Sequence, residues 1–139
     1  MPKEVFAVLE GEDQGQPVVA VVNEALTGFQ GKALFAWHLS IILPCQQCAA
    51  NGMPTRAERK IIDDIGDDVD RHLKADDNAL LLARITWNGT RRLLYRVHDP
   101  EVANEFLSRI VVDTAYRREI DFRMEHDEGW KLAEPFLSP

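Results

Sequence analysis

The chain lacks the sequence signals by which membrane proteins, secreted proteins and common enzymes are recognised. Its apolar runs fall well short of the roughly 18 residues that a membrane span needs, and the run near the N-terminus stops at Glu10 and Gly11. Nucleophile elbows, phosphate-binding loops, dinucleotide fingerprints and zinc-protease helices are absent. We therefore expect a cytoplasmic protein with no catalytic residues, no cofactor and no metal site that the sequence can identify, and we favour a non-enzyme.

Basic residues are scarce relative to acidic ones. Sixteen lysines and arginines stand against 23 aspartates and glutamates, which gives a net charge of −7. A domain of this sign repels the phosphate backbone of nucleic acids and the anionic surface of membranes. We therefore expect neither nucleic acid nor membrane as a partner, and an association with another protein instead.

The length and composition indicate one folded domain over residues 1–139. Apolar residues make up 45% of the chain and charged residues 28%, which is close to the average of globular proteins. A chain of this length buries roughly two thirds of its unfolded surface. It therefore needs neither a disulfide nor a metal ion to fold.

Apolar periodicity predicts a mixture of strands and helices. Strands are expected at residues 5–9, 18–22, 33–43, 79–87, 91–98 and 119–125, with a loose loop over 11–17. Helices are expected at 23–29, at 55–74, after Asp99 and, briefly, after Asp127. Thr55 and Glu58 fit a capping box, and the Asn88-Gly89 pair predicts a two-residue hairpin turn.

Period-two alternation also assigns side chains to faces. In the strand at 33–43, one face should carry Phe35, Trp37, Leu39, Ile41 and Leu43. In the strand at 79–87, one face should carry Leu81, Ala83, Ile85 and Trp87.

This order of elements is typical of an α+β fold. It contains the βαββαβ pattern of a ferredoxin-like antiparallel sheet, preceded by a β-hairpin and followed by a short C-terminal helix. The same string can be divided into two ββαβα halves, at 4–74 and 79–137, which would indicate an internal duplication. Both interpretations stay open at this point.

Several segments, in order along the chain, resemble one known family. They read LFAW at 34–37, NGMPT at 51–55, ARITWNG at 83–89, RLLYRVHD at 92–99 and DEGW at 127–130. This set is similar to the bacterial family catalogued as domain of unknown function 695. The resemblance implies an α+β, ferredoxin-like domain related in fold to ribonuclease E activity regulator B, a small acidic protein that binds an enzyme. It implies no catalytic residues.

Four arginines on neighbouring predicted strands form a candidate partner surface. Arg84, Arg92, Arg96 and Arg123 are expected on the sheet face opposite the helices. An arginine-lined face suits acidic protein segments or carboxylate ligands. The alternative is ordinary pairing with neighbouring carboxylates on a solvated sheet, which contributes little energy.

The chain has only two cysteines, and they stand close together as Cys45 and Cys48. A pair with this spacing can close a disulfide or supply half of a zinc site. The turn residues at 51–54 leave no room for the helix that lowers the pKa of thioredoxin-like thiols. Cys45 and Cys48 are therefore a candidate thiol pair, and the structural interpretation is the simpler one.

The helix at 55–74 carries aspartates at 63, 64, 67 and 68, at a spacing that could hold a divalent cation. The simpler interpretation is a solvated acidic face that would present negative potential to a basic partner.

Two hypotheses on function follow. The first is a non-enzymatic protein-binding or regulatory module, with a homo-oligomer as one form of such binding. The second is a small-molecule- or metal-binding enzyme whose site lies between the N-terminal hairpin and the ferredoxin-like core.

Overall fold

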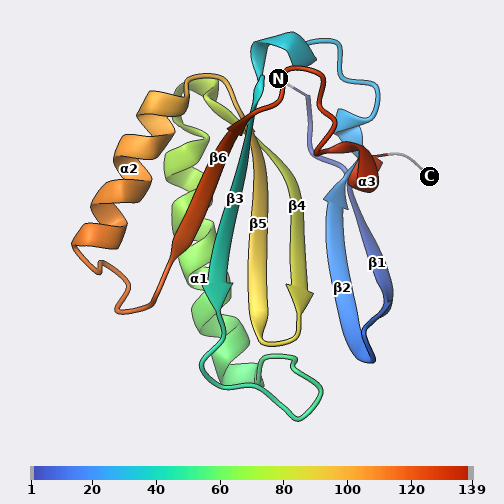
Figure 1. Cartoon of the computed structure of the whole chain (residues 1–139), viewed down its shortest axis with the longest axis vertical. Coiled ribbons are helices and arrows are strands. Elements are labelled where there is room, and N and C mark those ends of the chain that lie inside the picture. The colour runs from blue at the N-terminus through green and yellow to red at the C-terminus, as the bar shows by residue number, and fades with distance from the viewer. Residues whose placement is uncertain (1, 138–139) are drawn as a thin grey trace.

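A six-stranded antiparallel sheet forms the centre of the molecule. The computed structural model describes residues 2–137, and its strands follow the spatial order β1-β2-β4-β5-β3-β6 (Figure 1). They are β1 (Phe6–Asp13), β2 (Gln16–Asn23), β3 (Trp37–Pro44), β4 (Ala79–Trp87), β5 (Thr90–Val97) and β6 (Asp121–His126). The predicted mixture of strands and helices is confirmed.

Helices lie on both faces of the sheet, but unequally. The long helices α1 (Arg56–Leu73) and α2 (Pro100–Val112) cover one face (Figure 1). The opposite face is covered by the C-terminal segment with α3 (Glu134–Leu137) and by the 3₁₀ turn η1 (Glu24–Leu26). Two further 3₁₀ turns are η2 (Lys32–Leu34) and η3 (Ala75–Asp77). No helix of the described residues is long and apolar enough to cross a membrane.

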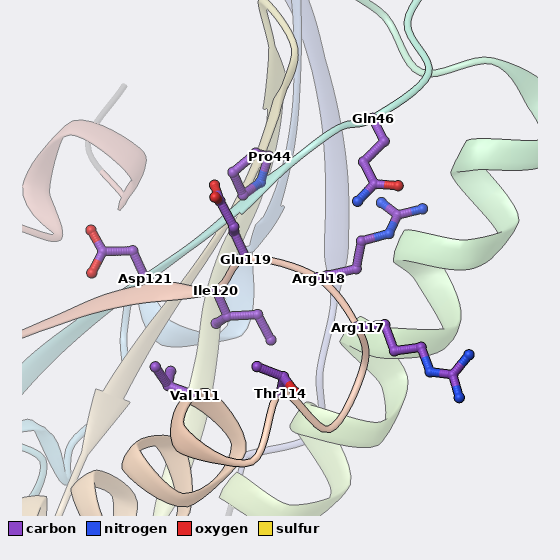
Figure 2. Close-up of a pocket in the computed structure, with 9 residues that line it drawn as sticks. All are labelled: Pro44, Gln46, Val111, Thr114, Arg117, Arg118, Glu119, Ile120 and Asp121. Carbon is purple, nitrogen blue, oxygen red and sulfur yellow. The ribbon is translucent and has the colours of Figure 1, made fainter.

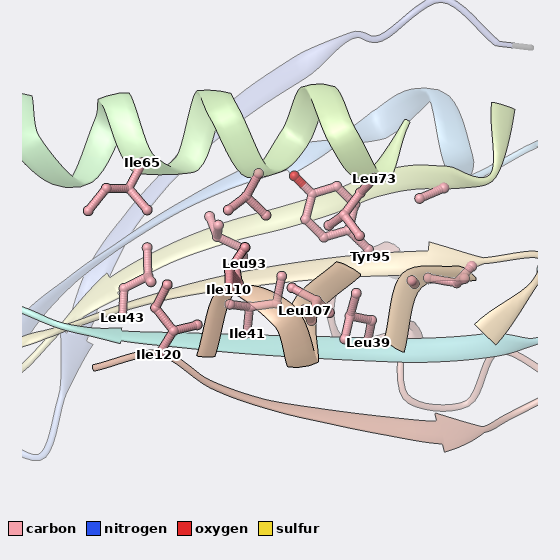
Figure 3. Packing of buried hydrophobic residues seen from close by; sticks show 14 residues of the cluster. Leu39, Ile41, Leu43, Ile65, Leu73, Leu93, Tyr95, Leu107, Ile110 and Ile120 are labelled. Carbon is pink, nitrogen blue, oxygen red and sulfur yellow. The ribbon is translucent and has the colours of Figure 1, made fainter. Parts of the chain in front are cut away.

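Two apolar clusters form the core, one on each side of the sheet. The cluster on the side of α1 and α2 is shown in Figure 3. Its members are Leu39, Ile41, Leu43, Ile65, Val69, Leu73, Ala79, Leu93, Tyr95, Val97, Ala103, Leu107, Ile110 and Ile120. The cluster on the other side consists of Val22, Leu26, Phe35, Leu80, Leu82, Ala83, Leu94, Trp130 and Ala133.

The hairpin turns differ from one another in how well the sequence predicts them. Asn88 and Gly89 both adopt positive φ, at 45° and 81°, as the predicted two-residue turn requires. The loose loop predicted over 11–17 is wrong. Gln14 and Gly15 form a tight turn with φ of 51° and 77°, and the residues on either side of it pair from Asp13 and Gln16 onward.

The third strand begins later than predicted. Residues 32–34 form η2, and β3 begins at Trp37. Phe35 precedes the strand and packs in the cluster opposite α1, while Leu39 and Ile41 pack beneath the helices. The predicted common face for these residues is therefore wrong at Phe35.

A β-bulge in β4 changes which residues share a face. The register with β5 shifts between Leu81 and Ala83. Leu81 packs with the cluster beneath α1, whereas Ala83 and Ile85 belong to the opposite side. The predicted common face is wrong, because an extra residue reverses the alternation beyond it. Arg84 is thereby turned toward α1.

The predicted capping box at the start of α1 forms only in part. Thr55 Oγ1 accepts a hydrogen bond from the N–H of Glu58 at 3.3 Å, as a helix cap should. The Glu58 carboxylate does not complete a capping box. It accepts from the backbone N–H of Gln46 at 2.6 Å, and the N–H of Thr55 donates to Gln47.

The two predicted halves differ in the lengths of their elements. The helix after β2 is the three-residue η1, whereas the one after β5 is the 13-residue α2. The final helix of the first half, α1, has 18 residues, and α3 has four. These differences give an internal duplication no support.

Candidate functional site

A groove runs between α1 and the N-terminal hairpin formed by β1 and β2. Two adjoining cavities of about 300 and 220 Å³ make up this groove, and both are lined by Asp63, Arg84 and Arg91. The groove exists because α1 packs over β3, β4 and β5, and the helical layer ends before β2. It lies between the hairpin and the rest of the sheet.

Arg91 is locked in place at the floor of the groove. Its Nη1 donates to Asp63 Oδ1 at 2.7 Å, and its Nε donates to Thr86 Oγ1 at 2.8 Å. Thr86 is the residue opposite Arg91 in the β4–β5 ladder, so one strand pair positions both groups. The Arg91 side chain is buried, and its charge is balanced by Asp63.

Arg84 is a charged residue of the groove that, like Glu10 and Asp67, forms no ion pair with another described residue. It lies beside Val21 of β2 and Leu93 of β5, and it is half-buried. Within residues 2–137, no carboxylate oxygen lies within 4.0 Å of its guanidinium. A partly buried guanidinium without a counter-ion favours the arrival of an acidic group.

The hairpin gives the groove an apolar wall. Phe6 and Val8 of β1 are 48% and 61% exposed, and they lie on the face of the sheet that α1 shares. Val19 and Val21 of β2 continue this wall toward Arg84. We call these four residues the hairpin shelf.

The far end of the groove is a closed polar network. Tyr95 Oη donates to Asp70 Oδ1 at 2.6 Å, and Lys74 Nζ pairs with Asp70 at 2.8 Å and with Glu4 at 2.7 Å. Burial, and then the charge of Asp70, raise the pKa of Tyr95. Burial would lower the pKa of Lys74, but its bonds to Asp70 and Glu4 raise it. Both groups therefore stay protonated near neutral pH.

The structure divides the four arginines of the predicted partner surface. Arg84 faces the groove, on the side of α1. Arg92 and Arg123 lie exposed on the opposite side of the sheet, and Arg123 pairs with Glu125 at 2.9 Å. Arg96 is completely buried. The four do not form one surface, because the bulge turns Arg84 away and the C-terminal segment covers Arg96.

Arg96 instead fastens the C-terminal segment to the sheet. Its Nη1 donates to Asp127 Oδ2 at 2.9 Å, its Nε donates to the Phe35 carbonyl at 3.3 Å, and it stacks at 4.6 Å on the ring of Trp130. Burial would raise the pKa of Asp127, but the N–H of Leu132 and the Arg96 guanidinium together lower it. Asp127 is therefore ionised and holds Arg96 in place.

The candidate thiol pair lies in the loop after β3. Cys45 is half-buried and Cys48 is exposed, with Cys48 Sγ 3.8 Å from the Cys45 carbonyl oxygen. Burial, followed by the neighbouring Cys48, raises the pKa of Cys45 to about 11. Disulfide formation at this pair stays a prediction. Among the residues described, no group of three His, Cys, Asp or Glu side chains could hold a metal ion.

The predicted acidic face of α1 is already partnered at several positions. Asp63 pairs with Arg91 and Asp64 with Lys60, while Asp68 bonds to Arg71 and to Tyr116. Because these aspartates already bind different groups of the chain, the face favours neither a divalent-cation site nor a uniform acidic surface.

A further cavity, of about 910 Å³, lies at the end of α2 (Figure 2). Arg118 on its wall donates through two nitrogens to the buried carboxylate of Glu58, each at 2.7 Å. These bonds, and then the N–H of Gln46, hold the pKa of Glu58 below its usual value despite burial. The charge of Arg118 is therefore neutralised, whereas Arg117, Glu119 and Asp121 on the same wall are exposed. Sequence reasoning missed this pair, which spans 60 positions.

The architecture and groove define a mixed α/β protein with a six-stranded antiparallel sheet and an open flank at its N-terminal hairpin. The chain matches the sequence profile of a family of unknown function (DUF695) over residues 11–138, and it belongs to this family. The resemblance noted in the sequence is thus confirmed. No curated protein and no solved structure matches the chain.

Proposed function

We propose that this protein is a non-enzymatic module that binds another protein in the cytosol. The partner's binding segment would lie in the groove, with a carboxylate on Arg84 and apolar side chains on the hairpin shelf. The single observation that carries the proposal is the half-buried Arg84 without a counter-ion beside exposed apolar residues. A charge that is partly removed from water, next to apolar surface, favours a segment that supplies both complements.

The state of the titratable groups supports binding rather than catalysis. A general base or acid has to be free to exchange a proton near neutral pH. In the groove, Asp63 is tied to Arg91, and Tyr95 is tied to Asp70. These pairs position the walls of the groove, and Arg84 remains without an ion-pair partner among the described residues.

We also propose that the four strands beside the hairpin form a ferredoxin-like core. Strands β4, β5, β3 and β6 are neighbours in that order, and β3-α1-β4-β5-α2-β6 follows along the chain. Both helices lie on one face. This arrangement supports a core that carries the hairpin as an extension, with the groove where the two meet.

The proposal is tested by reversing Arg84. The tagged chain would be used as bait in an extract of the cells that produce it, and the captured protein purified and titrated by calorimetry. Arg84→Glu should weaken the affinity roughly 30-fold or more, because a desolvated charge pair becomes a repulsion. Arg92→Glu is the matched control on the opposite side and should stay within about twofold. The affinity of the unchanged chain should fall as salt rises.

Two results would contradict the proposal. Equal binding by both variants would remove Arg84 from the interface, and a loss confined to Arg92→Glu would move the interface to the opposite side of the sheet. A small carboxylate that binds the isolated chain through Arg84 and displaces the protein would instead favour the small-molecule interpretation.

A further inference from the structure

The helical layer on the groove side lacks a helix over the hairpin. In Figure 1, α1 passes behind β6 and α2 lies on the outer side of β6, and none of the helices of residues 2–137 covers that face at β1 and β2. Two strands spaced by about 4.8 Å present a surface about as wide as one α-helix with its side chains, which measures roughly 10 Å. The exposed hairpin shelf is therefore of the size that one helix would cover.

Gly66 of α1 gives a second, independent observation. It lies in the middle of the 18-residue helix and lines the groove. Glycine inside a helix costs about 1 kcal/mol relative to alanine. A methyl group at this position would come no closer than 3.9 Å to Leu93 Cδ1, so the chain's own packing does not demand glycine. A bare backbone on this face lets another helix approach closely.

We propose that the groove receives an amphipathic α-helix of a partner protein, lying beside α1 with its closest approach at Gly66. This inference rests on the proposed function and specifies the form of the bound segment. The helix would place apolar residues three and four positions apart on the hairpin shelf, and a glutamate or aspartate on Arg84.

The charges along the groove define the partner helix further. Arg59 and Glu10 line the part of the groove near the start of α1, the exposed Asp67 lines the other part, and Arg84 lines both. A helix with acidic residues near Arg84 and a basic residue opposite Asp67 complements this pattern. A second copy of the chain is disfavoured as the source, because each copy carries a net charge of −7.

The test uses a display library of 18-residue peptides selected against the full chain. Half of the library carries an amphipathic helical pattern with varied charges, and the other half has a proline at its centre, which excludes a continuous helix. The helical half should be enriched in acidic, apolar binders. Their binding should fall at least tenfold with Gly66→Phe, which fills the line of approach, and stay within about twofold with Gly66→Ala.

A second pair of variants covers the event that Gly66→Phe does not fold. Val8→Lys places a charge on the hairpin shelf, and Leu9→Lys places the same charge on the other side of the same strand, where Leu9 is 56% exposed. Val8→Lys should weaken the selected helices at least tenfold, and Leu9→Lys should leave them within about twofold.

The outcomes separate this inference from the proposed function. Two results would overturn the partner helix and leave the proposed function standing. The first is a set of binders that depend on Arg84 but come from the proline half of the library. The second is a set of binders whose affinity changes with neither Gly66→Phe nor Val8→Lys. Binders whose affinity is unchanged by Arg84→Glu, or a library that yields no binders, would count against both the partner helix and the proposed function. Self-association of the chain that Val8→Lys abolishes would assign the groove to a second copy and overturn the partner helix.

Discussion

The sheet consists of two regions that differ in how far helices and loops cover them. Strands β4, β5, β3 and β6 are enclosed by α1 and α2 on one side, and they are partly covered by the C-terminal segment on the other. Strand β2 is rich in valine and the first half of β1 is apolar, yet β1 is exposed along nearly its whole length. The difference lies in what covers the strands. Covering elements turn apolar strands into a stable core, and their absence leaves apolar side chains exposed.

Two arginines show the same contrast at the level of single groups. Arg96 is fully enclosed, and Asp127, backbone carbonyls and the Trp130 ring satisfy it. Arg84 reaches a groove and has no acidic partner within 4.0 Å in the part of the chain that the structure describes. The first arginine is part of the core, and the second is available to a ligand.

Removing Arg96 should have the largest effect on stability. Arg96→Met leaves the Asp127 carboxylate nearly buried without its counter-ion, and such a loss typically costs about 3–5 kcal/mol. Urea unfolding should show this decrease, while Arg92→Met, at an exposed position, should change the free energy of unfolding by less than about 0.5 kcal/mol. Equal effects from both variants would show that the enclosed region does not depend on this anchor.

Glu58→Gln should have the next largest effect. The variant leaves Arg118 beside an amide in place of a buried carboxylate that accepts two of its hydrogen bonds. Losing such charge-assisted bonds should cost about 2–3 kcal/mol in the free energy of unfolding. Glu105→Gln, which breaks an exposed pair with Arg109 on α2, should cost about 0.5 kcal/mol or less. A smaller loss at Glu58 than at Glu105 would contradict the distinction between covered and exposed pairs.

The enclosed region should also determine how stability depends on pH. The folded pKa values of Glu58 and Asp127 are lowered, so their contributions are present above the unfolded values of about 4.3 and 3.9 and are lost as the pH falls through the folded values. Burial and the charge of Arg96 also lower the pKa of His38, so its contribution begins to be lost below about pH 6.5.

Urea titrations between pH 7 and pH 3 would measure this dependence. The free energy of unfolding should decline gently below about pH 6.5 and steeply below about pH 4.5. His38→Gln should remove the first decline, and Glu58→Gln should reduce the second. Stability that rises on acidification would contradict the assigned directions.

The sequence predicts local features well and fails where one residue changes a register. The helix expected at 55–74 and the turn at Asn88 depend on neighbours in the chain, and both appear as predicted. The bulge at Leu82 leaves no mark in the alternating pattern, yet it reverses the face of Arg84. Arg84 therefore does not share a face with Arg92 and Arg123.

The buried ion pairs could not be predicted from local sequence patterns, for a different reason. Arg96 and Asp127 are 31 positions apart, and Glu58 and Arg118 are 60 apart. Charged residues in a sequence are normally assigned to solvent, because burial is costly without a partner. Only the packing of distant segments reveals that a partner is present. The groove, in contrast, lies where the junction between hairpin and core was expected.

The smallest effect on stability should come from the hairpin shelf, and it tests the comparison most directly. Val8→Ala removes a side chain that is 61% exposed, so the free energy of unfolding should change by less than about 0.5 kcal/mol. Val22→Ala, on the next strand of the same hairpin, removes a side chain buried against Leu26 and Leu82 and should cost about 2 kcal/mol. If Val8→Ala proved as costly as Val22→Ala, the shelf would already be covered in solution, for instance by a second copy, and the groove would not be open. If it proved neutral, the exposed apolar side chain would contribute little to folding, which is the expected property of a residue that contributes to binding instead.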